Sequence, residues 1–149
     1  MITRRKLLIA IGAGALAAPL AGLAQRQSAK IPRIGYLTND SQSADLPRRD
    51  AFRQGLTDLG YREGQNIVVE YRTAEGKGDK LPELAAELHH LKVDLIFAFS
   101  LLAVEAARKE MPTVPIVSIS PDPVAAGFVA SLARPGGNIT GLIALELHA

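Results

Sequence analysis

The 149-residue chain contains no cysteine. This absence excludes disulfide bonds, thiolate metal sites, cysteine nucleophiles and a lipid anchor attached through cysteine. No stretch of the sequence groups lysine and arginine with interleaved aromatic residues, so we expect no nucleic-acid partner. The G-x-S-x-G turn that presents the nucleophile of α/β-hydrolases is also missing, and no nucleophile and base stand in a suggestive pattern. We therefore predict that the protein is not an enzyme.

The three histidines have no metal-binding spacing. His89 and His90 are adjacent, so on a helix they would point to different faces, whereas a zinc-protease site needs two histidines four residues apart. His148 lies in the tail of the sequence. We expect the adjacent pair at a solvated helix end, where a positive charge is favourable, and we predict no metal site.

Residues 1–24 have the pattern of a secretory signal peptide. Three cations at positions 4–6 precede an uncharged run at 7–24 that is rich in alanine, leucine and isoleucine. The small residues Gly22 and Ala24 suit the −3 and −1 positions of a cleavage site. Because two of the cations are adjacent arginines, the segment also fits a twin-arginine export signal. We predict export to the periplasm with cleavage near Ala24.

The same segment has two other interpretations, an uncleaved membrane anchor and a dinucleotide-binding motif. The apolar run has about the minimum length of a membrane span, although Pro19 and several glycines weaken it as an uncleaved anchor. Residues 12–17 imitate the G-x-G-x-x-A motif of dinucleotide-binding folds. That motif needs an acidic residue about 20 positions later, and the first acidic residue of the chain is Asp40. We therefore predict no nucleotide cofactor and no other cofactor.

Cleavage of the signal would change the charge of the chain. Three of the 17 basic residues lie at positions 4–6 and no acidic residue precedes Asp40, so 14 basic and 15 acidic residues would remain. The basic isoelectric point of the whole sequence therefore gives no reason to expect binding to nucleic acid. About 125 residues would remain, which is enough for a single hydrophobic core.

Strand and helix patterns alternate after a short polar linker at residues 25–32. Short apolar or β-branched runs predict strands. They lie at residues 33–37, 66–72, 93–99, 116–119 and 139–143. Apolar residues at helical spacing predict four helices. The first follows a cap at Asp45 and ends at Gly60, the second follows a cap at Asp79, and the others lie at 101–110 and 124–132.

This alternation predicts an α/β fold, with a doubly wound parallel sheet and helices on both faces. Right-handed crossovers and short connections favour the strand order 2-1-3-4-5. In such sheets a ligand binds beyond the carboxyl ends of the strands, where the direction of winding reverses. The loops at that edge contain the candidate ligand-binding residues Thr38, Asn39, Asp40, Ser100, Ser118, Ser120 and Asp122.

These residues suit an amino acid or a similar small ligand. The amino end of the helix after Ser100 favours a carboxylate, and Asp40 or Asp122 could accept an ammonium group. Each residue also has a purely structural interpretation. Ser100 could be a helix cap, Asp122 could fix a turn between two prolines, and Thr38 and Asn39 are typical turn formers. Tyr36 could contact the ligand or belong to the core.

Several stretches of the chain are typical of one protein family. The most specific is VASLARPGGNITG at residues 129–141, joined by RIGYL at 33–37, AFRQGL at 51–56 and LPELAAEL at 81–88. Further stretches lie at residues 59–61, 63–67, 70–72, 115–117, 122–124 and 127. With these residues the chain resembles the tryptophan/tyrosine-type substrate-binding proteins of ABC transporters, which have the type I periplasmic-binding fold.

The resemblance implies a two-lobed receptor that closes on a small organic ligand and delivers it to an ABC permease in the inner membrane. Members of the family are about twice as long, so the resemblance implies that residues 33–143 form the first lobe and that 144–149 begin the crossover to a second. We expect a truncated receptor whose cleft wall is exposed, which would favour self-association. An extracytoplasmic ligand-sensing domain and a non-functional gene fragment are the alternatives.

Overall fold

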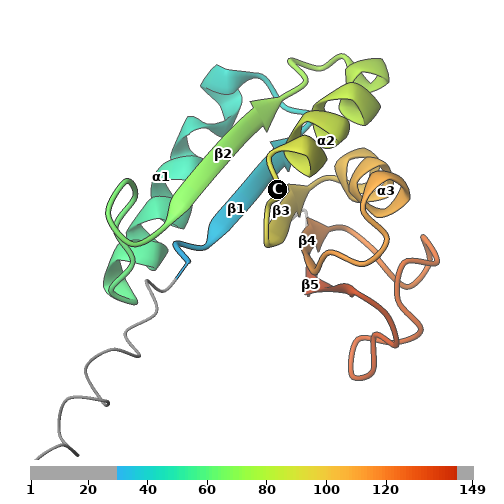
Figure 1. Cartoon of the computed structure of the whole chain (residues 1–149). Coiled ribbons are helices and arrows are strands. Elements are labelled where there is room, and N and C mark those ends of the chain that lie inside the picture. The colour runs from blue at the N-terminus through green and yellow to red at the C-terminus, as the bar shows by residue number, and fades with distance from the viewer. Residues whose placement is uncertain (1–29, 144–149) are drawn as a thin grey trace, which may run out of the picture. The chain divides into compact units, whose positions relative to one another are not determined.

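The computed structural model describes residues 30–143; the predicted signal peptide, most of the predicted linker and residues 144–149 lie outside the described part. The described chain forms a parallel sheet of five strands in the order β2-β1-β3-β4-β5 (Figure 1). This is the predicted fold class and strand order. The strands are β1 (Arg33–Thr38), β2 (Val68–Thr73), β3 (Leu95–Phe99), β4 (Ile116–Ser120) and β5 (Ile139–Ile143).

Helices cover both faces of the sheet, as predicted. Figure 1 shows α1 (Gln42–Asp58) on one face, with α2 (Leu81–His90) and α3 (Leu101–Glu110) on the other. A short 3-10 helix, η1 (Gly78–Lys80), leads into α2. No helix between residues 30 and 143 has the length and the apolar character that crossing a lipid bilayer requires.

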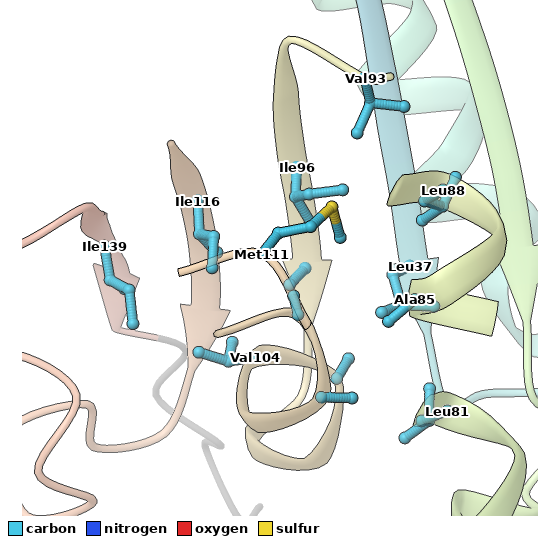
Figure 2. Close-up of a cluster of buried hydrophobic side chains, with 14 of the residues drawn as sticks. Leu37, Leu81, Ala85, Leu88, Val93, Ile96, Val104, Met111, Ile116 and Ile139 are labelled. Atoms are coloured by element: carbon cyan, nitrogen blue, oxygen red, sulfur yellow. The ribbon is translucent and has the colours of Figure 1, made fainter. Parts of the chain in front are cut away.

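The face beneath α2 and α3 contains an aliphatic core. Figure 2 shows Ile96 of β3, Ile116 of β4 and Ile139 of β5 directed toward the same layer as Leu88 of α2 and Val104 of α3. Each of these five side chains is buried. Because the small side chains of α3 lie against the sheet, the helix packs close to β3 and β4. The predicted close-packed face consists of Ala103, Ala106 and Ala107.

Gly35 allows α2 to approach β1. A Cβ atom at this position would lie 2.6 Å from Cδ1 of Ile96 and 3.1 Å from Cδ1 of Leu88. The hydrogen of glycine therefore leaves the space that these two side chains occupy.

The face beneath α1 contains an aromatic cluster instead. The ring of Tyr36 lies 5.4 Å from that of Phe52 in α1, 5.3 Å from Tyr71 in β2 and 5.2 Å from Phe97 in β3. Tyr36 is completely buried, and its hydroxyl donates a hydrogen bond of 2.8 Å to Asp45. Of its two sequence-based interpretations, the structure shows the core position.

Both predicted helix caps are wrong. Ser41 caps α1, because it has extended backbone angles and its hydroxyl accepts a hydrogen bond from the amide of Ala44 at 3.3 Å. Asp45 lies inside the first turn, drawn inward by the hydroxyl of Tyr36. Asp79 belongs to η1, and Lys80, which precedes α2, makes no side-chain cap.

The helix predicted at residues 124–132 is also wrong, since the structure has turns there. The amide of Ala126 bonds to the carbonyl of Asp122, and the next residue, Gly127, has a φ of +71° that ends any helical continuation. Val129 is nevertheless buried and Phe128 packs against the core. The helical spacing of these apolar residues therefore reflects a packed loop and not a helix.

Two glycine substitutions test this packing. Gly35→Ala is expected to lower the free energy of unfolding by about 1–3 kcal/mol, because the new methyl group displaces Ile96 and Leu88. Gly55→Ala in α1 is the matched control, since a Cβ there meets nothing within 4 Å. The control is expected to raise the free energy by up to about 1 kcal/mol. Urea unfolding of both variants measures the difference, and equal stabilities would contradict the packing described.

Candidate functional site

An open pocket lies at the edge where β1, β3 and β4 end. It contains about 630 Å³ of empty space. Its lining residues are Asp40, Phe99, Ser100, Leu101, Leu102, Ile119, Ser120 and Pro121. Strand order reverses between β1 and β3, so the loops that follow these two strands separate and leave room for a ligand. The pocket therefore lies at the position that the sequence predicts for the site.

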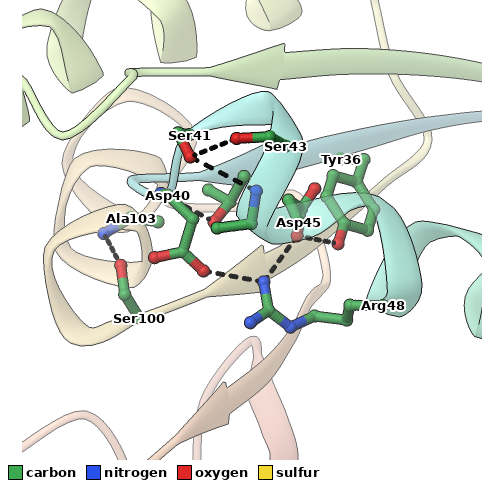
Figure 3. Close-up of polar contacts among 10 residues, drawn as sticks. Tyr36, Asp40, Ser41, Ser43, Asp45, Arg48, Ser100 and Ala103 are labelled. Carbon is green, nitrogen blue, oxygen red and sulfur yellow. Dashed lines mark hydrogen bonds and ion pairs between the residues drawn. The ribbon is translucent and has the colours of Figure 1, made fainter.

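Ser100 combines a structural role with a strained backbone. Its hydroxyl caps α3 by accepting a hydrogen bond from the amide of Ala103 at 3.3 Å (Figure 3). Its backbone angles, φ +96° and ψ 153°, lie in a region that is essentially restricted to glycine and costs about 1–3 kcal/mol. The amide of Ser100 bonds to the carbonyl of Ile119 at 3.2 Å, which holds the pocket end of β3 to that of β4. Ser100 is both a helix cap and a pocket residue.

Ser120 provides an uncommitted polar group. Its side chain is 1% exposed, and its hydroxyl has no hydrogen-bond partner among the described residues. Buried hydroxyls are normally paired, so an unpaired one in a pocket wall marks a place for a ligand or a water molecule. Other parts of the wall, including Leu101, Ile119 and Pro121, are apolar.

Ser118 lies apart from this pocket. It is also 1% exposed and unpaired among the described residues, but it lines a second, smaller pocket with Val129, Thr140 and Gly141. A Cβ atom on Gly141 would collide with the backbone oxygen of Ser118. The close approach of β5 to β4 therefore explains why a glycine stands at position 141, the last residue of the stretch at 129–141 that resembles the family.

Thr38 and Asn39 lie outside the pocket lining and shape the loop after β1. Thr38 is completely buried, and its hydroxyl accepts a hydrogen bond from the amide of Asp40 at 3.2 Å. The backbone carbonyl of Asn39 accepts a hydrogen bond from Gly76 at 2.7 Å. The side-chain oxygen of Asn39 is buried without a partner in the described part of the chain. The turn-forming interpretation describes the observed contacts of both residues.

Asp40 lines the pocket, but one of its oxygens is already engaged. The guanidinium of Arg48 donates to Asp40 at 2.8 Å and to Asp45 at 2.5 Å, as Figure 3 shows. The same guanidinium carbon lies 3.2 Å above the centre of the Phe99 ring. Sequence reasoning missed Arg48. The available signal was the spacing of Asp45 and Arg48, three residues apart on one helix face.

The surroundings of Arg48 and Tyr36 shift the pKa of both side chains upward. Burial and then the hydrogen bond to Asp45 raise the pKa of Tyr36 well above its ordinary value. Burial alone would lower the pKa of Arg48, but the hydrogen bond and charge of Asp40, with the charge of Asp45, reverse that effect and raise it. Arg48 therefore stays cationic and Tyr36 stays protonated at physiological pH.

Asp122 is exposed and does not line the pocket. Its carboxylate accepts a hydrogen bond of 2.8 Å from the amide of Ala125. The observed contact is the turn-fixing one, and a ligand contact by Asp122 stays a prediction. His89 lies 3.2 Å from the carboxylate of Glu110, between the exposed ends of α2 and α3. Within residues 30–143 no three metal-ligating side chains come together.

Comparison with known sequences relates most of the chain to one family. The profile of a family described as ABC transporter substrate binding protein matches residues 37–148. The tyrosine-binding protein of Clostridioides difficile strain R20291 is 32% identical over an alignment of 155 positions, which covers 95% of this chain and 45% of that protein.

Solved structures share the fold of this chain. The ligand-free, open structure of a substrate-binding protein with adhesive properties from Clostridium difficile has a TM-score of 0.72 at 30% identity, over 78% of this chain and 40% of that chain. A conserved domain protein from Vibrio cholerae has a TM-score of 0.74 at 28% identity, over 79% and 40%.

A third structure contains a ligand. An ABC domain from Streptococcus pneumoniae in complex with L-Trp has a TM-score of 0.68 at 27% identity, over 75% of this chain and 38% of that chain. This chain thus spans less than half the length of each relative described. By its sequence profile and its fold, the chain belongs to the family of ABC transporter substrate-binding proteins.

Proposed function

We propose that residues 33–143 form one ligand-binding lobe of a receptor that captures a small organic molecule, such as an amino acid, and delivers it to an ABC permease. The observation that carries the proposal is the pocket at the reversal of strand order, which is lined both by Ser120, whose hydroxyl is unpaired among the described residues, and by the first residues of α3. The function is binding rather than catalysis, because the matching family is described as substrate-binding proteins.

The chemistry of the pocket suits an amphipathic ligand. A carboxylate would meet the amino end of α3, where the helix dipole favours negative charge, together with the hydroxyl of Ser120. The side chain of the ligand would pack against Phe99, Leu101 and Ile119. Relatives are described as tyrosine-binding and as a complex with L-Trp, so these two amino acids are the first probes to use.

An open pocket on one lobe needs an opposing surface to enclose its ligand. In this proposal that surface comes from a second lobe, consistent with the greater length of the relatives. The predicted signal peptide at residues 1–24 supports a periplasmic location, with the lobe beginning after the linker at 25–32. Self-association through an exposed cleft wall stays a prediction.

Paired serine variants test where the ligand binds. L-Trp and L-Tyr are expected to raise the melting temperature of the purified chain, and Ser120→Ala is expected to weaken their binding about tenfold by removing one hydrogen bond to a charged group. Ser118→Ala is the matched control. Both serines lie in β4 with 1% exposure, but only Ser120 lines the pocket.

Calorimetric titration gives the affinities, and tryptamine, which lacks the carboxylate, tests the role of α3. The proposal predicts weaker binding of tryptamine than of L-Trp. Equal losses in both serine variants would place the ligand elsewhere, and no response to either amino acid would remove aromatic amino acids as ligands of this lobe.

Ser100 allows a separate test. Its strained backbone lies in the pocket wall, and backbone strain of this kind tends to occur at ligand-binding sites. Ser100→Gly is expected to raise the free energy of unfolding by about 1 kcal/mol, since glycine accepts a φ of +96° and replaces a serine cap at a cost of a few tenths of a kcal/mol. Ser100→Ala keeps the strain, loses the cap and is expected to lower the free energy by about 1 kcal/mol. Urea unfolding would contradict this account if the glycine variant were the less stable of the two.

A further inference from the structure

Arg48 joins three parts of the chain that meet at the pocket. Its guanidinium bonds to Asp40 in the loop after β1 and to Asp45 in α1, and it covers the ring of Phe99 at the end of β3. Asp40 and Phe99 line the pocket, whereas Arg48 itself does not. The guanidinium therefore lies directly behind two lining residues.

The guanidinium of Arg48 is held in place by buried residues beneath α1. Asp45 is completely buried, and its carboxylate accepts hydrogen bonds from both the hydroxyl of Tyr36 and the guanidinium of Arg48. Tyr36 in turn packs between the rings of Phe52, Tyr71 and Phe97. A planar guanidinium held by two carboxylates has little freedom left, so the groups that it contacts are held as well.

We propose that Arg48 is the positioning residue of this pocket, which holds the Phe99 ring and the Asp40 carboxylate where a ligand meets them. The effect on affinity rests on the proposed function, whereas the effect on the ring does not. A ring and a loop that are already ordered lose less conformational entropy when a ligand binds, which strengthens binding without any direct contact from Arg48.

A neighbouring arginine provides the comparison. Arg49 lies on the same helix, and its guanidinium carbon is 4.1 Å above the centre of the Tyr71 ring in β2. Tyr71 is not among the residues that line the pocket. Arg49→Met therefore removes a similar cation–π contact and one positive charge without touching Asp40 or Phe99.

Replacing Arg48 alone would leave the buried charge of Asp45 without its cationic partner, which can prevent folding. The reference for the experiment is therefore Asp45→Asn, in which the amide oxygen still accepts the hydrogen bond from Tyr36. The test variant is Asp45→Asn with Arg48→Met, and the control is Asp45→Asn with Arg49→Met. Melting temperatures establish that all three are folded before any comparison.

The first measurement needs no ligand. The chain has four phenylalanines, so carbon-13 labelling of their rings gives few NMR signals, and the order parameter of each ring can be measured. The order parameter of Phe99 is expected to fall in the test variant and to stay at the reference value in the control. An unchanged Phe99 in a folded test variant would overturn the proposal.

The second measurement is the affinity for L-Trp. The test variant is expected to bind about three- to tenfold more weakly than the reference, which corresponds to the loss of one cation–π contact and its ordering effect. The control is expected to stay within about twofold. Equal affinity of test variant and reference would overturn the proposal. If L-Trp does not bind the reference either, the proposed ligand class fails, and the ring measurement still decides the role of Arg48.

Discussion

The pairing of β1 with both β2 and β3 is the constraint from which the candidate site follows. All neighbouring strands are parallel, so every strand ends at the same edge of the sheet. Because the chain winds outward from β1 in both directions, the loops after β1 and β3 must diverge. The pocket between Asp40 and Ser100 is the consequence, and its chemistry is set by the few residues that each loop contributes.

The alternating side chains of β1 give the two faces of the sheet different roles. Gly35 and Leu37 face the aliphatic layer beneath α2, while Tyr36 between them faces the aromatic cluster beneath α1. The aliphatic layer is tightly packed and contributes mainly to stability. The aromatic cluster contains the buried carboxylate of Asp45, and through it the charged groups behind the pocket. Stability and site construction thus depend on opposite sides of one strand.

Sequence periodicity predicted much of the fold. The bounds of α3 and β5 follow from apolar patterns, and the strand order follows from right-handed crossovers with short connections. The cap of α1 was misassigned because serine and aspartate both cap helices, and only the folded structure shows that Asp45 turns inward to bond with Tyr36. The helix prediction for residues 124–132 failed because packed turns can repeat apolar residues at helical spacing.

The candidate residues show a similar limit. Strand ends can be located in a sequence, and Asp40, Ser100 and Ser120 do meet in one pocket. The sequence does not show which other residues surround each of these side chains. Ser118 and Ser120 point to the same side of β4 yet line different pockets, and Asp122 is turned to a backbone amide. Arg48 was missed because its partners come from three separate elements.

Chemical-shift mapping tests the central claim most directly, namely that a small ligand binds where strand order reverses. L-Trp titrated into the nitrogen-15-labelled chain is expected to shift the amide signals of residues 100–103, 119 and 120. Signals at the opposite edge of the sheet, around the hollow formed by Arg53, Tyr61 and Arg62, are expected to stay in place. Shifts concentrated at that opposite edge, with none near Ser100 or Ser120, would contradict the account.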